Sequence, residues 1–360
     1  MSRFTRRQCV QGSLAAMTVA GSTAAALPSK VPAGGGIKLS EILNPGETGR
    51  MKLAKQIGIN HAIASISGVM AKVPRSQYLQ VLTQMKADYA AAGLKIAGVE
   101  SWPVPAEKIK LGIAGRDEEI ENMIAIVEAL SKAGIDMLCY NFMAGLGWYR
   151  TKVNVLERGG ALTSEFDSKA AEAQGLTQWG EITEEKMWAN MEYFQKAVMP
   201  VAEKWNVKMA LHPDDPPRQK LRGIARIVNS AANYRRIMDI VPSPVNGVTF
   251  CQANFVAMGE DIYKLAAEWL KQRKIFFVHY RDIQGQGAYF RETFHDNGPT
   301  DMPRILKIYA DGGFRGAIRP DHAPTMEGEE NDRPGYAMKG KIFAIGYMKG
   351  IMDAHKIPCE

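Results

Sequence analysis

Four residues of the metal-ligand type each stand at the end of a short apolar run. They are His212, Cys251, His279 and Asp321, which follow KMAL, VTF, IFFV and AIRP. The intervals between them are 39, 28 and 42 residues, each about the length of one strand plus one helix. Imidazole, thiolate and carboxylate all ligate divalent metals, and a thiolate favours zinc or iron(II) over manganese. The spacing therefore predicts one metal site built at four neighbouring strand ends.

Each of these residues has a simpler interpretation when it is taken singly. A lone histidine is more often a hydrogen-bonded structural residue, and a lone cysteine is more often a small buried apolar residue. The shared position at strand ends is what favours the metal site. Four protein ligands leave room for a substrate only where the metal expands beyond four-coordination.

Acid–base candidates lie in the phrase RPDH and in the later phrase RPGY. The planar fork of Arg319 suits a substrate carboxylate. His322 follows the ligand candidate Asp321, so its ring should point elsewhere and serve proton transfer. Tyr336 lies in a loop rich in glycine and proline, and it is a second acid–base candidate whose alternative is simple loop packing.

Other polar residues are candidates for contacts with a substrate. Glu100 and Asn141 end two further apolar runs, and Asp214 and Asp215 form an acidic turn between prolines. Such a turn is suited to substrate hydroxyls or to orienting the ligand histidines. His295, in FHDNG, is interpreted equally well as a pocket residue or as a loop residue.

Short apolar runs alternate with longer amphipathic ones along the chain. Predicted strands cover 59–66, 96–100, 137–141, 208–211, 248–250, 275–280 and the run into Asp321. Predicted helices cover 78–92, 117–133, 183–205, 261–272, 302–310 and 343–354. About seven or eight strand–helix units predict parallel strands in a single (β/α)8 TIM barrel, with its site at the carboxyl ends of the strands. Segment 152–180 has no clear periodicity and is predicted as a long loop over the mouth.

Composition limits the remaining classes. The 360 residues are 46% hydrophobic, enough for one large barrel or two smaller domains. The net charge of +7 is scattered, without a basic run interleaved with aromatic residues, which argues against nucleic-acid binding. No predicted strand is followed by GxGxxG or GxxxxGKS/T, which weakens dinucleotide and P-loop alternatives. Cys9 lies in a predicted leader, and the other cysteines form no disulfide framework.

The N-terminal stretch has the layout of a secretory signal. Basic residues around Arg6 and Arg7 precede a weakly apolar run and several small residues, and TRRQ resembles the twin-arginine export motif. The run is too short and too polar for a membrane span. We predict a signal peptide at 1–26, a linker at 27–37, a catalytic barrel domain at 38–360, and export to the periplasm. The alternative is a cytoplasmic tail with paired arginines.

Several phrases together resemble those of the mannonate dehydratase family. They are ESWPV, IKLG, RDEEIEN, CYNFM with the Trp148 that follows, HPDDPP, FHDNGPTDM, RPDH and PGY. The resemblance implies a barrel like that of xylose isomerase, a divalent metal (usually Mn²⁺, with Fe²⁺ as an alternative) and dehydration of D-mannonate to 2-keto-3-deoxy-D-gluconate. It implies a substrate contact for Trp148. By position, it implies that the metal ligands are His212, Cys251, His279 and Asp321. It implies that the catalytic group is Arg319, His322 and Tyr336.

The chain departs from the family pattern along the predicted pocket wall. Ala64-Ser65-Ile66 stands where the first strand of the family ends in a histidine, and the aromatic RWYGP-type opening is missing. Ala144 and Gly147 replace a proline and an aspartate, and Ala253-Asn254 replaces a Gly-Ser pair. The departures leave open an exported isomerase, epimerase or glycoside-cleaving lyase on another carbohydrate, and a non-catalytic sugar-binding protein. A homo-oligomer is also left open, because the sequence does not give the oligomeric state.

Overall fold

Eight parallel strands close into a barrel in the computed structural model, which describes residues 35–360. Each strand pairs with its neighbours in chain order, and the last pairs with the first, so the predicted (β/α)8 class is confirmed. The barrel strands are β1 (Lys38–Leu43), β2 (His61–Ser65), β3 (Lys95–Glu100), β4 (Met137–Tyr140), β7 (Lys208–Leu211), β10 (Asn246–Cys251), β11 (Ile275–His279) and β14 (Ala317–Arg319).

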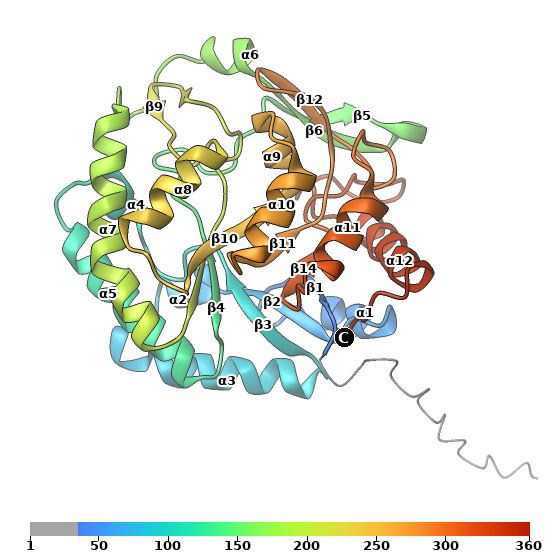
Figure 1. The fold of residues 1–360 in the computed structure, drawn as a ribbon, viewed down its shortest axis with the longest axis horizontal. Helices are drawn as coiled ribbons and strands as arrows, with labels where there is room; N and C mark the ends of the chain where they lie inside the picture. The colour runs from blue at the N-terminus through green and yellow to red at the C-terminus, as the bar shows by residue number, and fades with distance from the viewer. Residues whose placement is uncertain (1–34) are drawn as a thin grey trace, which may run out of the picture. The chain divides into compact units, whose positions relative to one another are not determined.

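Helices surround the strands and cover the outside of the barrel (Figure 1). They are α1 (Thr48–Gln56), α2 (Ser67–Met70), α3 (Tyr78–Ala91), α4 (Glu107–Leu111), α5 (Arg116–Lys132), α7 (Glu184–Lys204), α8 (Ala231–Ile240), α9 (Gln252–Met258), α10 (Ile262–Lys271), α11 (Met302–Asp311) and α12 (Met338–Ala354). Side chains of Thr183, Asp261 and Asp301 cap the amino ends of α7, α10 and α11 by accepting backbone N–H bonds. The apolar stripe of each long helix packs on the strands, as in α10, where Trp269 is fully buried.

The sequence pattern does not predict β1, and it therefore places the first strand at residues that form β2. Polar side chains interrupt the apolar run of β1, yet both Ser40 and Glu41 are buried. The Ser40 hydroxyl donates to the Ile318 carbonyl at 2.9 Å, and a carboxylate oxygen of Glu41 lies 3.3 Å from Nζ of buried Lys341. These partners, distant in sequence, explain why the strand has no apolar signal of its own.

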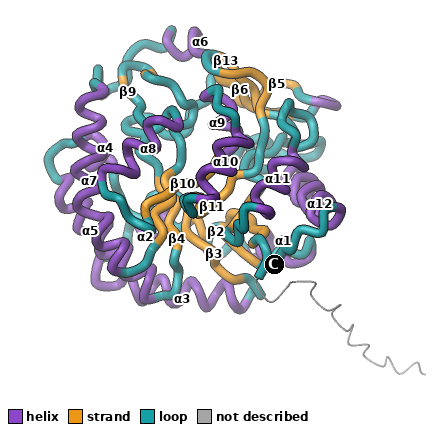
Figure 2. The backbone as a smooth tube through the Cα atoms, viewed as in Figure 1, coloured by secondary structure: helices purple, strands orange, loops and turns teal. Residues whose placement is uncertain are grey.

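The segment predicted as a long loop instead contains ordered strands. There, β5 (Lys152–Leu156) and β6 (Leu162–Asp167) form a hairpin, followed by α6 (Ser168–Glu172). A second hairpin, β12 (Ile283–Gln286) and β13 (Tyr289–Glu292), pairs with β6 and completes a four-stranded antiparallel sheet, the insertion sheet (Figure 2). Both hairpins follow carboxyl ends of barrel strands, so the insertion sheet stands on the side of the barrel where the site is expected.

A two-stranded ladder, β8 (Lys220–Leu221) and β9 (Ile224–Ala225), lies in the connection between β7 and α8. The described part of the chain contains no helix that combines the length and the apolar character needed to cross a bilayer. The predicted signal peptide and nearly all of the predicted linker lie outside the described residues.

Candidate active site

A cavity of about 240 Å³ opens at the carboxyl ends of the barrel strands. Most of the predicted site residues line it, namely Glu100, Asn141, Trp148, His212, Asp215, His279, Arg319, Asp321, His322 and Tyr336. The other three, Cys251, Asp214 and His295, are buried behind this lining. The structure therefore brings the predicted residues together at one place, as expected for strand ends of a barrel.

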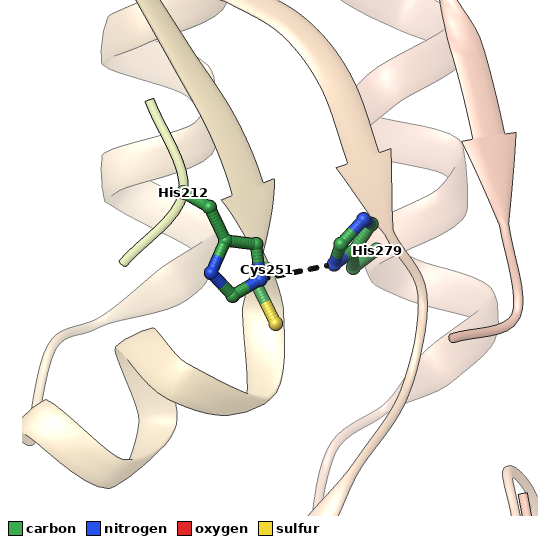
Figure 3. Close-up of side chains that lie close together, drawn as sticks. All are labelled: His212, Cys251 and His279. Atoms are coloured by element: carbon green, nitrogen blue, oxygen red, sulfur yellow. Dashed lines mark hydrogen bonds between the residues drawn. The ribbon is translucent and has the colours of Figure 1, made fainter. Parts of the chain in front are cut away.

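Donor atoms of three predicted ligands converge at the strand ends. The ligand atoms of His212, Cys251 and His279 all lie within 4.8 Å of one another (Figure 3). Asp321 joins them, because its Oδ2 lies 3.5 Å from His279 Nδ1 and 3.7 Å from Cys251 Sγ. Two imidazoles, one thiol and one carboxylate thus surround a common point.

The two imidazoles are oriented as metal ligands usually are. His212 Nδ1 lies 2.7 Å from the Pro213 carbonyl, which accepts its proton and leaves Nε2 to face His279 Nδ1 at 3.2 Å. His279 Nε2 has no hydrogen-bond partner among the described residues, and its nearest carboxylate oxygen, on Glu100, is 3.4 Å away. Each ring therefore turns one nitrogen to the shared point and the other to an oxygen, which fits a divalent metal.

Burial sets the protonation of these donors. It lowers the pKa of His212 to about 4, and the neighbouring His279 adds to this effect. Burial raises the pKa of the Cys251 thiol. Burial alone would raise the pKa of Asp321, but His322 and the Arg319 guanidinium hold it well below its usual range. At neutral pH the set therefore offers neutral imidazole, a carboxylate and a protonated thiol that a metal must deprotonate.

The cation Arg281 is a site residue that the sequence analysis missed. It is buried, and its Nε donates to Asp321 Oδ2 at 2.5 Å, while its Nη2 donates to Asp215 at 2.8 Å and to Asn254 at 2.5 Å. A signal was present, because Arg281 follows His279 by two residues. Asn254, whose side chain also lies 3.4 Å from the Cys251 thiol, does not line the cavity.

Arg319 is committed to carboxylates of the protein itself. It donates to Glu100 through Nε at 2.8 Å and through Nη2 at 2.5 Å, and its Nη1 lies 2.9 Å from Asp321. Burial alone would raise the pKa of Glu100, but Arg319 holds it well below the usual range. This pair stabilises the wall of the cavity, and a substrate carboxylate would have to share Arg319 with two existing partners. Substrate binding by Arg319 stays a prediction.

Three rings meet beside the metal-donor residues. The His322 ring centroid lies 5.2 Å from that of Tyr336 and 5.3 Å from that of Trp148. Gly335 makes this possible, because its φ is +85° and an added Cβ would lie 3.0 Å from His322 Cβ. Burial raises the pKa of the Tyr336 phenol, which therefore keeps its proton.

Glu292 is the second residue that the sequence analysis missed. It ends β13 of the insertion sheet, and its Oε1 lies 2.8 Å from His322 Nδ1. Arg150 binds the same oxygen at 2.5 Å and also binds both carboxylate oxygens of Asp215. The hairpin around Gly285 and Gly287 is readable in the sequence, but no local signal directs Glu292 to His322.

The remaining candidates differ in their distance from the cavity. Asn141 lines it, and its Oδ1 accepts from the Met143 backbone N–H at 3.3 Å. Asp214 accepts from the Val228 backbone N–H at 2.8 Å, and His295 Nε2 lies 2.6 Å from the Pro320 carbonyl. Asp214 and His295 thus support the loops behind the lining, and substrate contact by either stays a prediction.

The fold and the donor set together define a barrel enzyme suited to metal-assisted proton transfer. The sequence model of the D-mannonate dehydratase (UxuA) family matches residues 36–180 and 171–358. The chain belongs to this family, and it is an enzyme of the hydro-lyase type. The family resemblance inferred from the sequence is thereby confirmed.

Individual relatives agree with this assignment. Mannonate dehydratase from Streptococcus equi subsp. zooepidemicus is 33% identical over 326 residues, which are 82% of this chain and 89% of the relative. The crystal structure of mannonate dehydratase from Streptococcus suis serotype2 has a TM-score of 0.81 at 28% identity and covers 90% of this chain and 97% of its own. A xylose isomerase domain protein from Planctomyces limnophilus, at 13% identity, a TM-score of 0.56 and coverage of 90% and 98%, shares the fold alone.

Proposed function

We propose that this enzyme dehydrates D-mannonate to 2-keto-3-deoxy-D-gluconate with a bound divalent metal. The observation that carries the proposal is the meeting, around one cavity, of four metal-donor side chains with the rings of His322 and Tyr336. Relatives that bear the name mannonate dehydratase support the substrate. Such a reaction needs one group to take a proton from carbon and another to protonate a leaving hydroxyl, and the two rings offer both.

The proposed metal ligands are His212, Cys251, His279 and Asp321. Their fit rests on the convergence of their donor atoms and on the ionised carboxylate of Asp321. A divalent metal held by these residues would supply positive charge that stabilises the negative charge formed when the C2 proton is removed. The family resemblance favours Mn²⁺, whereas the Cys251 thiolate favours Fe²⁺ or zinc. Metal analysis of the purified protein, with activity measured for each ion, decides between them.

The reaction moves protons and leaves the overall oxidation level unchanged. The C2–H bond breaks and its electron pair becomes the C2–C3 double bond, while the C3–O bond breaks and its pair departs with the oxygen. Of His322 and Tyr336, one takes the C2 proton and the other gives a proton to the departing hydroxyl, which leaves as water. The enol at C2 then tautomerises to the 2-keto acid.

A different sugar acid is the second candidate, and Gly147 is the observation that favours it. Gly147 lines the cavity directly before Trp148, where the family pattern has an aspartate. Without that carboxylate, a substrate hydroxyl loses a hydrogen-bond partner. Sites that bind a substrate hydroxyl through such a partner discriminate strongly between substrates that have the hydroxyl and those that lack it.

The test is an assay of the metal-loaded protein with D-mannonate that follows the 2-keto-3-deoxy acid. We expect turnover with Mn²⁺, loss of turnover after chelation, and recovery when the metal is restored. No product with Mn²⁺, Fe²⁺, Co²⁺ or Zn²⁺ would contradict D-mannonate as the substrate. A panel of other aldonic acids then tests the second candidate, and aldoses and keto-glycosides test isomerase, epimerase and glycoside-cleaving chemistry.

We also propose export through the twin-arginine signal at the N-terminus, supported by Arg6 and Arg7 and by the weakly apolar run that follows. Replacing both arginines (R6K/R7K) should hold the protein in the cytoplasm while the original chain is recovered from the periplasm. Cell fractionation measures this, and equal distribution of the two chains would contradict the proposal.

A further inference from the structure

The insertion sheet places a carboxylate against the catalytic imidazole candidate. Glu292 Oε1 lies 2.8 Å from His322 Nδ1, and both side chains are buried. Glu292 reaches this position from the last residue of β13, whereas His322 follows β14 of the barrel. The contact therefore joins the insertion sheet to the loop that follows the last barrel strand.

Guanidinium groups keep Glu292 ionised. Arg150 Nη2 donates to Glu292 Oε1 at 2.5 Å, and Arg281 Nη1 lies 3.5 Å from the same oxygen. Both arginines also bind Asp215, so their positions are fixed from two directions. An ionised carboxylate accepts hydrogen bonds and has no proton to donate.

The hydrogen bond determines which nitrogen of His322 carries the proton. Because Glu292 can only accept, Nδ1 must be the donor. In the neutral ring Nε2 is then bare, and it lies 3.7 Å from Asp321 Oδ1, beyond hydrogen-bonding distance. His322 lines the cavity, and with Nδ1 bound to Glu292 the bare Nε2 is the nitrogen left for a substrate proton.

We propose that Glu292 is a positioning residue that makes His322 the proton acceptor of the reaction and leaves Tyr336 as the proton donor. The assignment rests on the proposed dehydration and decides between the two roles left open there. The C2 proton passes to His322 Nε2, and the imidazolium that forms is stabilised by the Glu292 carboxylate. The Tyr336 phenol gives its proton to the C3 oxygen as the C3–O bond breaks and water leaves. The His322 imidazolium then releases its proton to solvent and Tyr336 takes one up, which restores both groups.

The alternative is that Glu292 only holds the insertion sheet to the barrel through Arg150 and Arg281. A role in stability would lower the yield or the melting temperature of a variant without changing the chemical step. A positioning role would lower kcat and leave KM nearly constant, because the contact to His322 matters most when charge develops on the ring.

Kinetics of E292Q test the proposal on D-mannonate with the metal-loaded enzyme. We expect kcat to fall on the order of 100-fold or more, KM to stay within about threefold, and bound metal to be unchanged. The primary isotope effect with C2-deuterated substrate should rise, because proton abstraction becomes slower. The matched control is E165Q: Glu165 is also a carboxylate of the insertion sheet, where it pairs with Lys152 at 2.9 Å, and its loss should leave kcat unchanged. Equal kcat for E292Q and E165Q would overturn the proposal.

A second measurement does not depend on turnover and observes His322 in the native enzyme. In zinc-loaded protein labelled with ¹⁵N-histidine, His322 should show a proton on Nδ1 that is protected from water and strongly downfield, and H322N should identify it. A bare Nδ1 would overturn the proposal. If the native enzyme fails to turn over D-mannonate while this proton is present, the substrate is wrong and the positioning of His322 by Glu292 stands. If turnover is present and E292Q keeps its kcat, the positioning role is wrong and the function stands.

Discussion

The two walls of the cavity are built by different means. The metal-donor wall consists of His212, His279 and Asp321 with Cys251 buried behind them, and each of the four lies at or just after the end of a barrel strand. On the acid–base wall, the ring of His322 is held by Glu292, which belongs to the insertion sheet. The regular barrel thus spaces the donors, while an addition to the barrel contacts and orients the His322 ring.

The walls also differ in how their charges are satisfied. On the donor wall a neutral imidazole and a protonated thiol offer lone pairs without charge, and the Asp321 carboxylate is bound by the guanidinium groups of Arg281 and Arg319. On the acid–base wall, Asp215 and Glu292 already have guanidinium partners in Arg150 and Arg281. Metal binding should therefore depend on the donor wall, and proton transfer should depend on the acid–base wall. Variants in one wall should change one of these properties and leave the other unchanged.

The largest effect is expected from the donor wall. C251S should lose most of its bound metal and at least ~10³-fold in kcat/KM, because a serine hydroxyl is a far weaker ligand than a thiolate. Metal analysis and the D-mannonate assay measure both. The control is C359S, since Cys359 is partly exposed and remote from the cavity. Full metal content in C251S would remove Cys251 from the donor set.

A smaller effect is expected on the acid–base wall. Arg150 binds Asp215 bidentately and also binds Glu292, and a lysine cannot reproduce that fork. R150K should lower kcat roughly 10- to 100-fold and keep its metal. A parallel loss of metal in R150K would show that the two walls are not separable.

The pH dependence of metal binding tests the donor wall alone. Because burial raises the pKa of the Cys251 thiol, the metal must displace its proton, and affinity should rise by about tenfold per pH unit between pH 6 and 8. His212, with a pKa of about 4, is already neutral in this range and adds no proton. Calorimetry in buffers of different ionisation enthalpy should report about one proton released per metal ion. A flat profile would mean that the thiol is not a ligand.

The smallest effect is expected from the loop that carries Tyr336. G335A should lower kcat a few-fold, because an added Cβ would lie 3.0 Å from His322 Cβ, and lower the free energy of unfolding by about 1 kcal/mol. G313A is a matched control, since Gly313 also has a positive φ but has open space around it. If G313A loses a comparable amount of stability but keeps full activity, the activity loss in G335A comes from the contact with His322.

The donor wall could be predicted from the sequence because its residues recur once in each strand–helix unit of the barrel. Each barrel strand that carries a donor is apolar enough to be recognised, and the donor is its last residue in β10 and β11 or follows within two residues in β7 and β14. Strand β1 was not predicted because it contains two buried polar residues. Their partners are distant in sequence: Ser40 bonds to Ile318, and Glu41 pairs with Lys341.

The acid–base wall could be predicted only in part, for a physical reason. His322 and Tyr336 are found through the phrases RPDH and PGY, but Glu292 contacts His322 from the insertion sheet, a meeting that no local pattern encodes. Likewise, the commitment of Arg319 to Glu100 depends on two strand ends that meet only when the barrel closes.

Asp321 connects the two walls through a single peptide unit. Its φ is +59°, a left-handed conformation that aspartate tolerates, and the next residue is His322. If Asp321 binds the metal as proposed, a displacement of its carboxylate by an ion of a different radius should be passed to the backbone that carries His322, the proposed proton acceptor. Ions of unequal size that bind with similar strength should consequently differ in how fast the enzyme turns over, so discrimination among metals is exerted through catalysis more than through affinity.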